Sequence, residues 1–186
     1  MNIGIIIGSV RDDRRGDDVG SWVNKRAQAR DTEATYELID LRQFDLPVLT
    51  SATVPGAAKR QYDDERVTRW GTVIDGCDAF IFVTPEYNHG IPGGFKNAFD
   101  VIYPEWVKKA VAFVSYGAAS GFRVVEAWRG VVGNADMYDI RTQVAFSTFV
   151  DFDGEEFTPA ERHPGELDDL MESLEAAATV MATLRG

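Results

Sequence analysis

The alternation of short apolar runs with longer amphipathic segments restricts the fold of this chain more than any other feature of its sequence. Apolar or β-rich runs occupy residues 3–7, 35–40, 79–84, 111–115 and 139–149. Segments with apolar residues at helical spacing follow them, at residues 19–30, 57–74, 95–102, 122–132 and 167–184. The runs IGIII and AFIFVT contain no alternating polar residues, which is typical of strands buried on both faces. This order predicts a parallel sheet with helices on both faces.

Five such strands are typical of a flavodoxin-like α/β fold, a three-layer sandwich whose five-stranded parallel sheet has the strand order 2-1-3-4-5. The chain has 186 residues, which suits one hydrophobic core, so residues 1–186 are expected to form a single domain. Residues 46–56 contain two prolines and are expected to be a loop. Residues 151–161 are acidic without calcium-loop spacing, so a solvated surface loop is expected there.

The chain is acidic, because 30 Asp and Glu residues outnumber 19 Lys and Arg residues and give a net charge of −11. This charge disfavours nucleic acids and anionic membrane surfaces as partners. The N-terminal apolar run has no basic residues before it, so it is expected to be a strand and not a signal peptide. Cys77 is the single cysteine, which excludes an internal disulfide and suits the cytoplasm, the expected location. With only His89 and His163 besides, a structural zinc site is not expected.

The loop after the first run has the composition of a phosphate site. In a doubly wound sheet, ligands bind beyond the carboxyl ends of the strands. This loop offers the hydroxyl of Ser9, the guanidinium groups of Arg11, Arg14 and Arg15, and Gly16 near an expected helix start. Hydroxyl, guanidinium and free helix N–H groups together are typical of phosphate binding. The loop matches neither the Walker A pattern nor the dinucleotide fingerprint. The alternative is a solvated loop in which the arginines pair with the aspartates beside them.

The loop after the third run, TPEYNHGIPGG, suits a flat heterocycle. Pro85 fixes the backbone as the strand ends, Tyr87 supplies a flat face, and Asn88 supplies both donors and acceptors. The glycines of the loop leave backbone N–H groups unshielded. The alternative is a structural turn whose tyrosine belongs to the core.

The loop after the fourth run, SYGAASG, resembles a nucleophile elbow only superficially. The spacing of Gly117 and Ser120 does not fit G-x-S-x-G, so a hydrolase is disfavoured. Small residues here are expected to line one edge of a ligand. A phosphate loop beside two loops that suit a planar ring points to a flat ring tethered to a phosphate, which is the shape of flavin mononucleotide (FMN).

Four motifs resemble the NADPH-dependent FMN reductase family, the flavodoxin-like NAD(P)H:quinone and azo reductases. These are GSVR at residues 8–11, TPEYN at 84–88, FKNA at 95–98 and SYGAASGFR at 115–123. The resemblance extends over residues 2–149. It implies that FMN is the cofactor and that NADPH or NADH is the hydride donor.

The resemblance also implies a set of cofactor-binding residues. Ser9, Arg11, Arg15 and Gly16 would hold the phosphate; Pro85, Glu86, Tyr87 and Asn88 would follow the isoalloxazine ring; Ser115 and Gly117 would line its pyrimidine edge. The cofactor carries the chemistry in such enzymes, so no catalytic residue is expected.

The implied activity is hydride transfer from the nicotinamide through FMN to a quinone, an azo compound, free flavin or a similar small acceptor, by ping-pong kinetics. A non-enzymatic, flavodoxin-type electron carrier is the main alternative, and a sensing domain that has lost FMN is a third. A homodimer or homotetramer is expected, with Tyr103 and Trp106 at an interface, because amphipathic aromatics favour interfaces. The alternative is that both aromatics cap the core.

Overall fold

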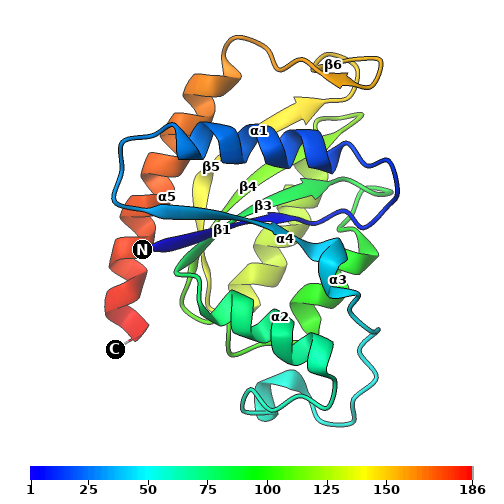
Figure 1. Cartoon of the computed structure of the whole chain (residues 1–186), viewed down its shortest axis with the longest axis vertical. Helices are drawn as coiled ribbons and strands as arrows, with labels where there is room; N and C mark the ends of the chain where they lie inside the picture. Colours follow the sequence, from blue (N-terminus) through cyan, green and yellow to red (C-terminus); the bar gives the residue numbers. More distant parts are fainter. Residues whose placement is uncertain (186) are drawn as a thin grey trace.

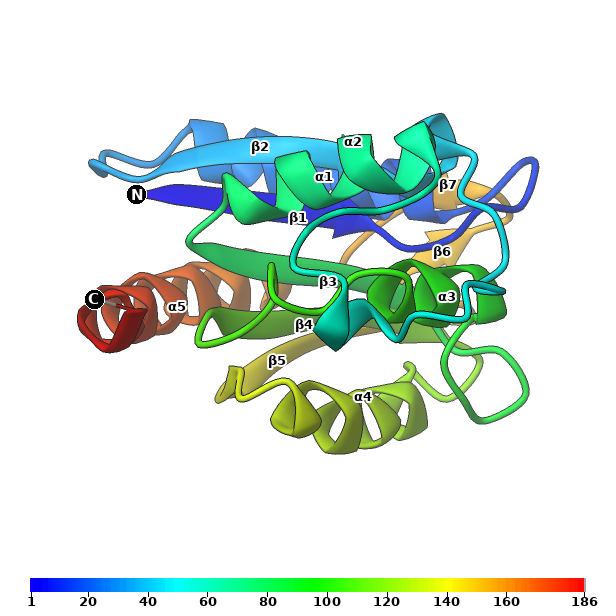
Figure 2. The same ribbon diagram turned by 90° about the horizontal axis from the view of Figure 1, so that it is seen from below.

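The computed structural model describes residues 1–185 and contains a five-stranded sheet in the order β2-β1-β3-β4-β5, with every neighbouring pair parallel. Figures 1 and 2 show this sheet between two layers of helices. The strands are β1 (Asn2–Ile7), β2 (Thr35–Asp40), β3 (Ala79–Pro85), β4 (Ala110–Gly117) and β5 (Tyr138–Ser147). The helices are α1 (Gly16–Gln28), α2 (Glu65–Asp75), α3 (Gly93–Asp100), α4 (Phe122–Asn134) and α5 (His163–Arg185). The predicted flavodoxin-like fold and strand order are confirmed.

The central strands bury both of their faces, which explains their unbroken apolar sequences. Phe80 and Phe82 of β3 pack into one core with α2, α3 and α4. Ile81 and Val83 of the same strand point into a second core with α1 and α5. Successive side chains of a strand point to opposite faces, so a strand between two helical layers needs apolar residues at every position. Within residues 1–185, no helix combines the length and apolar composition needed to cross a membrane.

The helix expected at residues 57–74 is shorter than predicted and begins at Glu65. The Asp64 side chain accepts a hydrogen bond from the Arg66 N–H and caps this start. Lys59 and Arg60 have φ angles of 53° and 61°, which no α-helix contains. The preceding residues Pro55–Ala57 form a 3₁₀ turn instead. Charge and periodicity over residues 57–64 therefore suggest a helix that the backbone does not form.

Residues 153–161 are exposed or partly exposed, as expected of an acidic surface loop, but the segment also has a buried, ordered part. Asp151 and Phe152 are 1% and 7% exposed. The segment contains a short antiparallel pair, β6 (Phe152–Asp153) and β7 (Glu156–Phe157). Two aromatic side chains on this pair, Phe152 and Phe157, lie with ring centroids 5.0 Å apart. The acidic residues between them stay exposed.

Trp106 lies in the core, so its expected place at an interface is wrong and the alternative holds. Its side chain is 0% exposed, and its ring stacks on Phe99 at a centroid distance of 4.9 Å. Its indole Nε1 donates to the Phe99 carbonyl at 3.0 Å. Tyr103 is partly buried, and its hydroxyl donates to the Asn134 carbonyl at 2.8 Å. An apolar stacking partner and a buried acceptor together satisfy the indole without any partner chain.

We predict that Trp106→Ala lowers the free energy of unfolding by about 3–5 kcal/mol, because it opens a cavity in a packed aromatic core. The control is Val180→Ala, since Val180 is an apolar residue of α5 that is 62% exposed. That control should change stability by about 0.5 kcal/mol or less. Urea denaturation followed by circular dichroism measures both. Equal effects of the two substitutions would contradict the core position of Trp106.

Candidate functional site

Three loops meet at the carboxyl edge of the sheet, where all five parallel strands end. Ile7 pairs with Val83 of β3, and Val83 pairs with Val114 of β4. The loops that follow β1, β3 and β4 are therefore neighbours in space, on the side to which the strand arrows point in Figure 1. The register thus brings the three sequence-predicted loops together.

The loop after β1 leaves its backbone donors free beside a helix start. Gly8 donates its N–H to the Val83 carbonyl at 2.9 Å. Within residues 1–185, no N–H of residues 9–15 donates to a backbone carbonyl. Gly16 begins α1, and a Cβ placed there would lie 2.7 Å from the Tyr116 hydroxyl, so a side chain at this position would force the Tyr116 ring to move. Free N–H groups at the positive end of a helix dipole form a cradle for an anion.

Arg14 holds this loop in place and is not available to a ligand. Its side chain is buried, and its guanidinium forms ion pairs with Asp17 at 2.7 Å and Asp40 at 2.8 Å. It also donates to the Ser9 carbonyl. The alternative in which arginines pair with neighbouring acids is therefore correct for Arg14. Because Asp17 is engaged in this pair, its negative charge is partly neutralised beside the loop.

The other two arginines of the loop differ in their contacts. Arg15 donates to the carbonyls of Thr148 at 3.3 Å and Gly154 at 3.0 Å, and its guanidinium lies 4.5 Å from the Phe152 ring centroid. It thus joins the loop to the β6–β7 segment. Arg11 is exposed, and its guanidinium lies 5.8 Å from the Tyr87 ring centroid. Arg11 is consequently the guanidinium of this loop that is most open to a ligand.

The loop after β3 is a rigid two-residue turn. The Tyr87 N–H donates to the Gly90 carbonyl at 3.1 Å, and the Gly90 N–H donates back at 2.9 Å. Asn88 and His89 between them have φ angles of 49° and 65°, as a type I′ turn requires. Both are exposed, while Pro85 is buried as the last residue of β3. The turn presents the Tyr87 side chain toward the loop after β1.

Glu86 is already engaged in fixing this turn to its neighbours. Its N–H donates to the Tyr116 carbonyl at 3.0 Å. Its carboxylate accepts from the Arg123 N–H at 3.1 Å and from the Arg123 guanidinium at 2.9 Å. A carboxylate at the first turn of α4 also interacts favourably with the helix dipole. Glu86 therefore fixes the backbone of this turn against β4 and the start of α4.

The loop after β4 closes on itself around a buried serine. The Ser115 hydroxyl donates to the Ser120 carbonyl at 2.8 Å. Gly121 has a φ of 72°, and a Cβ there would lie 2.8 Å from the Ser115 Cβ. Gly117 is partly exposed, and the following Ala118 and Ala119 are exposed. Ser115 thus shapes this wall through its turn, and Gly117 provides its open backbone.

The FKNA motif of α3 packs against the start of the first loop and binds the segment after β2. A Cβ at Gly8 would lie 1.9 Å from the Phe95 ring, so the ring fixes where the first loop begins. Asn97 donates through Nδ2 to the Pro47 carbonyl at 2.8 Å and accepts from the Leu49 N–H at 3.0 Å. These contacts tie the long segment after β2 to α3. The motif is therefore part of the scaffold.

A buried histidine that the sequence does not mark as structural holds the β6–β7 segment. His163 is 0% exposed and lies between two carboxylates, Asp151 at 3.0 Å from Nε2 and Glu166 at 2.8 Å from Nδ1. Asp151 also accepts from the Ser147 N–H at 2.8 Å. These contacts clamp the end of β5 to the start of α5. The His-x-x-Glu spacing at the helix start is the available signal in the sequence, but it gives no indication of Asp151.

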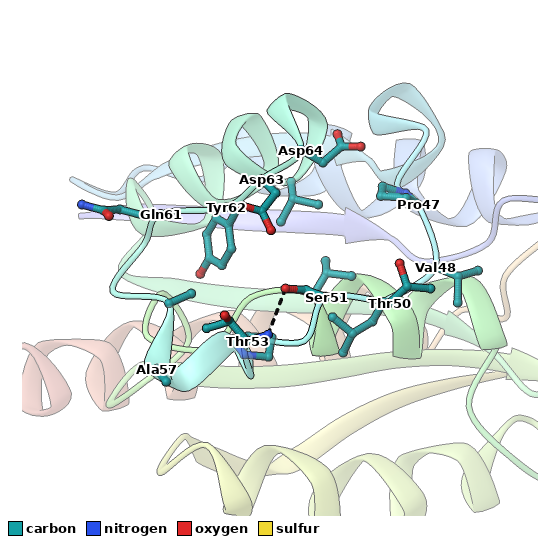
Figure 3. Close-up of a pocket in the computed structure, with 15 residues that line it drawn as sticks. Pro47, Val48, Thr50, Ser51, Thr53, Ala57, Gln61, Tyr62, Asp63 and Asp64 are labelled. Atoms are coloured by element: carbon teal, nitrogen blue, oxygen red, sulfur yellow. Dashed lines mark hydrogen bonds between the residues drawn. The ribbon is translucent and has the colours of Figure 1, made fainter.

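A cavity of about 410 Å³ lies between α2 and the segment after β2, and none of its lining residues belongs to the three loops (Figure 3). Its lining consists of Pro47, Val48, Leu49, Thr50, Ser51, Thr53, Pro55, Ala57, Ala58, Gln61, Tyr62, Asp63, Asp64, Val67 and Val101. This lining includes two aspartates and no basic side chain, so a phosphate would be repelled there. The carboxyl edge is the better candidate for a phosphorylated ligand.

Comparison with known proteins identifies the family of this chain. The model of the family described as NADPH-dependent FMN reductase matches residues 1–151, which include all three loops. The NAD(P)H-dependent FMN reductase ntnL of Nectria sp is 41% identical over 124 residues, covering 65% of this chain and 62% of that protein. The match thus spans less than two thirds of that relative's length. A quinone reductase of Pseudomonas putida is 31% identical over 143 residues, covering 73% of this chain and 72% of that protein.

The fold also has close counterparts among solved structures. The FerB flavoenzyme NAD(P)H:(acceptor) oxidoreductase from Paracoccus denitrificans superposes with a TM-score of 0.73. The two chains are 20% identical, and the superposition covers 95% of this chain and 98% of that one. At this identity the similarity establishes the shared fold.

We predict that Asp151→Ala lowers the free energy of unfolding by about 3 kcal/mol, because each buried donor left without its partner costs about 1–3 kcal/mol. Asp153→Ala is the matched control, since Asp153 is exposed on the same segment. It should change stability by about 0.5 kcal/mol or less. Urea denaturation compares the two variants. An Asp151→Ala protein as stable as the wild type would show that the clamp does not hold this segment.

Proposed function

The chain belongs to the NADPH-dependent FMN reductase family, and on that premise we propose that it is an FMN-dependent NAD(P)H oxidoreductase. Its acceptor would be a quinone, an azo compound, free flavin or a similar small molecule. The observation that carries this proposal is the cradle of free N–H groups at residues 9–15, which lies next to the Tyr87 turn. A phosphate cradle beside a turn suited to a planar ring matches both ends of FMN.

The residues at the carboxyl edge fit FMN in their chemistry. The N–H groups of residues 9–16, the Ser9 hydroxyl and Arg11 would hold the phosphate. Arg15 is proposed as a further phosphate ligand, although its present partners are carbonyls of Thr148 and Gly154. The FMN would supply the chemistry of accepting a hydride from NAD(P)H and passing electrons to an acceptor.

The ring would lie against backbone and not against reactive side chains. Pro85, Glu86, Tyr87 and Asn88 would follow the isoalloxazine, with Ser115 and Gly117 at its pyrimidine edge. The Glu86 and Ser115 side chains are hydrogen-bonded within the protein, so they would orient the loops and leave backbone groups to contact the ring. No side chain is assigned a proton-transfer role.

The names of the relatives favour a reductase over an electron carrier. The relatives from Nectria sp and Pseudomonas putida are both named as reductases. We extend this activity to the present chain as part of the proposal. A carrier would exchange electrons with partner proteins but would not oxidise NAD(P)H, and a sensing domain that had lost FMN would not bind the flavin at all.

We also propose a cytoplasmic homodimer or homotetramer. Cys77 is 4% exposed, and burial raises its pKa to about 11, which keeps the thiol unreactive. A chain with a single cysteine forms no internal disulfide, which supports the cytoplasmic part of the proposal. Apolar side chains are exposed in the loops that follow β1 and β5, among them Val10 at 45%, Phe149 at 79% and Val150 at 68%. Exposed apolar residues at one edge of a sheet favour a protein interface there. Sedimentation showing a monomer at micromolar concentration would contradict the oligomer.

We predict ping-pong kinetics, because the three loops surround a single proposed ring site that donor and acceptor would have to enter in turn. Double-reciprocal plots at several quinone concentrations should be parallel. Anaerobic mixing with NADPH or NADH alone should bleach the bound flavin. Intersecting lines would require a separate acceptor site. Failure of both nucleotides to bleach the flavin would favour the electron carrier.

We predict that Arg11→Ala weakens FMN binding by about 1.5–3 kcal/mol, the usual contribution of a charge-assisted hydrogen bond. Arg60→Ala is the matched control, because Arg60 is an exposed arginine paired with Asp75 outside the three loops. That control should bind FMN as the wild type does. Flavin fluorescence quenching gives both dissociation constants. Equal affinities of the two variants would place the phosphate away from Arg11.

A further inference from the structure

Two hydroxyl groups from different loops meet at the phosphate cradle. The Ser9 Oγ and the Tyr87 hydroxyl oxygen are 2.8 Å apart. Ser9 is 1% exposed, while Tyr87 is partly buried. The pairing of Ile7 with Val83 places the two loops next to each other, so this contact joins the end of β1 to the end of β3.

The Tyr87 side chain is held by a backbone that has little freedom. Its own N–H and C=O are both bonded to Gly90, at 3.1 Å and 2.9 Å. The preceding Glu86 is fixed by the Tyr116 carbonyl and by Arg123. Tyr87 therefore enters the contact as a preorganised partner, and little conformational freedom is lost when Ser9 binds to it.

A phosphate at the cradle determines the direction of this hydrogen bond. A serine hydroxyl has one proton to donate, and phosphate oxygens act as acceptors. If Ser9 donates to the phosphate, its oxygen must accept from Tyr87. The phenolic hydroxyl is a suitable donor, because a phenol O–H is a stronger hydrogen-bond donor than an aliphatic alcohol. Donation from Tyr87 also polarises the Ser9 hydroxyl and strengthens its bond to the anion.

The Tyr87 ring contacts a second member of the proposed phosphate site. The Arg11 guanidinium lies 5.8 Å from the ring centroid, within the range of a cation–π contact. One residue of the ring-binding turn thus contacts both a hydroxyl donor and a cation of the phosphate loop.

We propose that Tyr87 is a positioning residue for the phosphate, which lets this protein distinguish the phosphorylated flavin FMN from riboflavin. The inference rests on the proposed function and extends it to the selection of the ligand. Tyr87 directs the Ser9 proton toward the phosphate and supports Arg11 above its ring. Removing the Tyr87 hydroxyl weakens the binding of FMN and leaves the binding of riboflavin unchanged.

The test measures the dissociation constants of FMN and riboflavin for the wild type, Tyr87→Phe, Ser9→Ala and the double variant. Tyr87→Phe should bind FMN about fivefold more weakly, the scale of one hydrogen bond, with unchanged affinity for riboflavin. The double variant should bind FMN no more weakly than Ser9→Ala alone, because both substitutions interrupt one hydrogen-bonded chain. Tyr138→Phe removes an exposed hydroxyl from the start of β5 and should leave both affinities unchanged.

A second comparison isolates the ring. Tyr87→Leu should bind FMN about threefold more weakly than Tyr87→Phe, through loss of the cation–π contact. This difference should vanish when Arg11 is also replaced by alanine. Melting temperatures of all variants check that each is folded.

The outcomes separate this inference from the proposed function. Equal weakening of FMN and riboflavin by Tyr87→Phe would show that Tyr87 acts on the ring, and would overturn the inference alone. Additive effects of Tyr87→Phe and Ser9→Ala would overturn it as well. Failure of the wild-type protein to bind either flavin would overturn the proposed function, and this inference with it.

Discussion

The burial of β1, β3 and β4 on both faces is the constraint on which the rest of the structure depends. A strand packed on both sides cannot slip by one residue, because the slip would carry Phe82 from one core into the other. The fixed register brings the ends of these three strands to one edge. Gly8, Glu86 and Gly117 lie there together, although they are far apart in sequence. The candidate site is thus a direct result of packing in the two hydrophobic cores.

The local shape of this edge comes from loop residues with positive φ angles, which β-strands do not contain. Asn88, His89 and Ser120 have φ angles of 49°, 65° and 57°, and each such non-glycine residue costs about 1–3 kcal/mol. The surrounding hydrogen bonds offset this cost, and the turns they maintain leave backbone groups exposed. The same exposed backbone groups allow an acidic chain to have a phosphate site. N–H dipoles at a helix start keep their orientation whatever the net charge of the protein.

The sequence predicts the features that depend on apolar patterning and local composition. Runs such as residues 79–84 and 111–115 indicate strands because two-sided burial requires apolar residues at every position. The three loops are identified because they follow such runs. The periodic pattern places the start of α2 too early. Asp64 caps the helix, but in the sequence it is one of several charged residues and does not stand out as a boundary. Composition assigns Trp106 to an interface because an aromatic residue in a loop looks the same in sequence whether it is buried or exposed.

Contacts between distant side chains cannot be predicted from one sequence. Composition groups Arg14 with Arg11 and Arg15, yet the burial of Arg14 against Asp40 depends on the position of β2. The contact of His163 with Asp151 joins the two ends of a hairpin segment, and a hydroxyl contact joins the loops after β1 and β3. Each of these side chains acquires its role from the fold, so its residue type alone does not indicate the partner.

The most direct test of this account is a titration of the isotopically labelled protein with FMN, followed through the ¹H–¹⁵N spectrum of its backbone amides. The largest shifts should fall on residues 9–16, with further shifts on residues 86–90 and 117–121. These are the N–H groups of the proposed phosphate cradle and the two ring-binding loops. Shifts confined to residues 47–64, which line the cavity in Figure 3, with residues 9–16 unchanged, would contradict it.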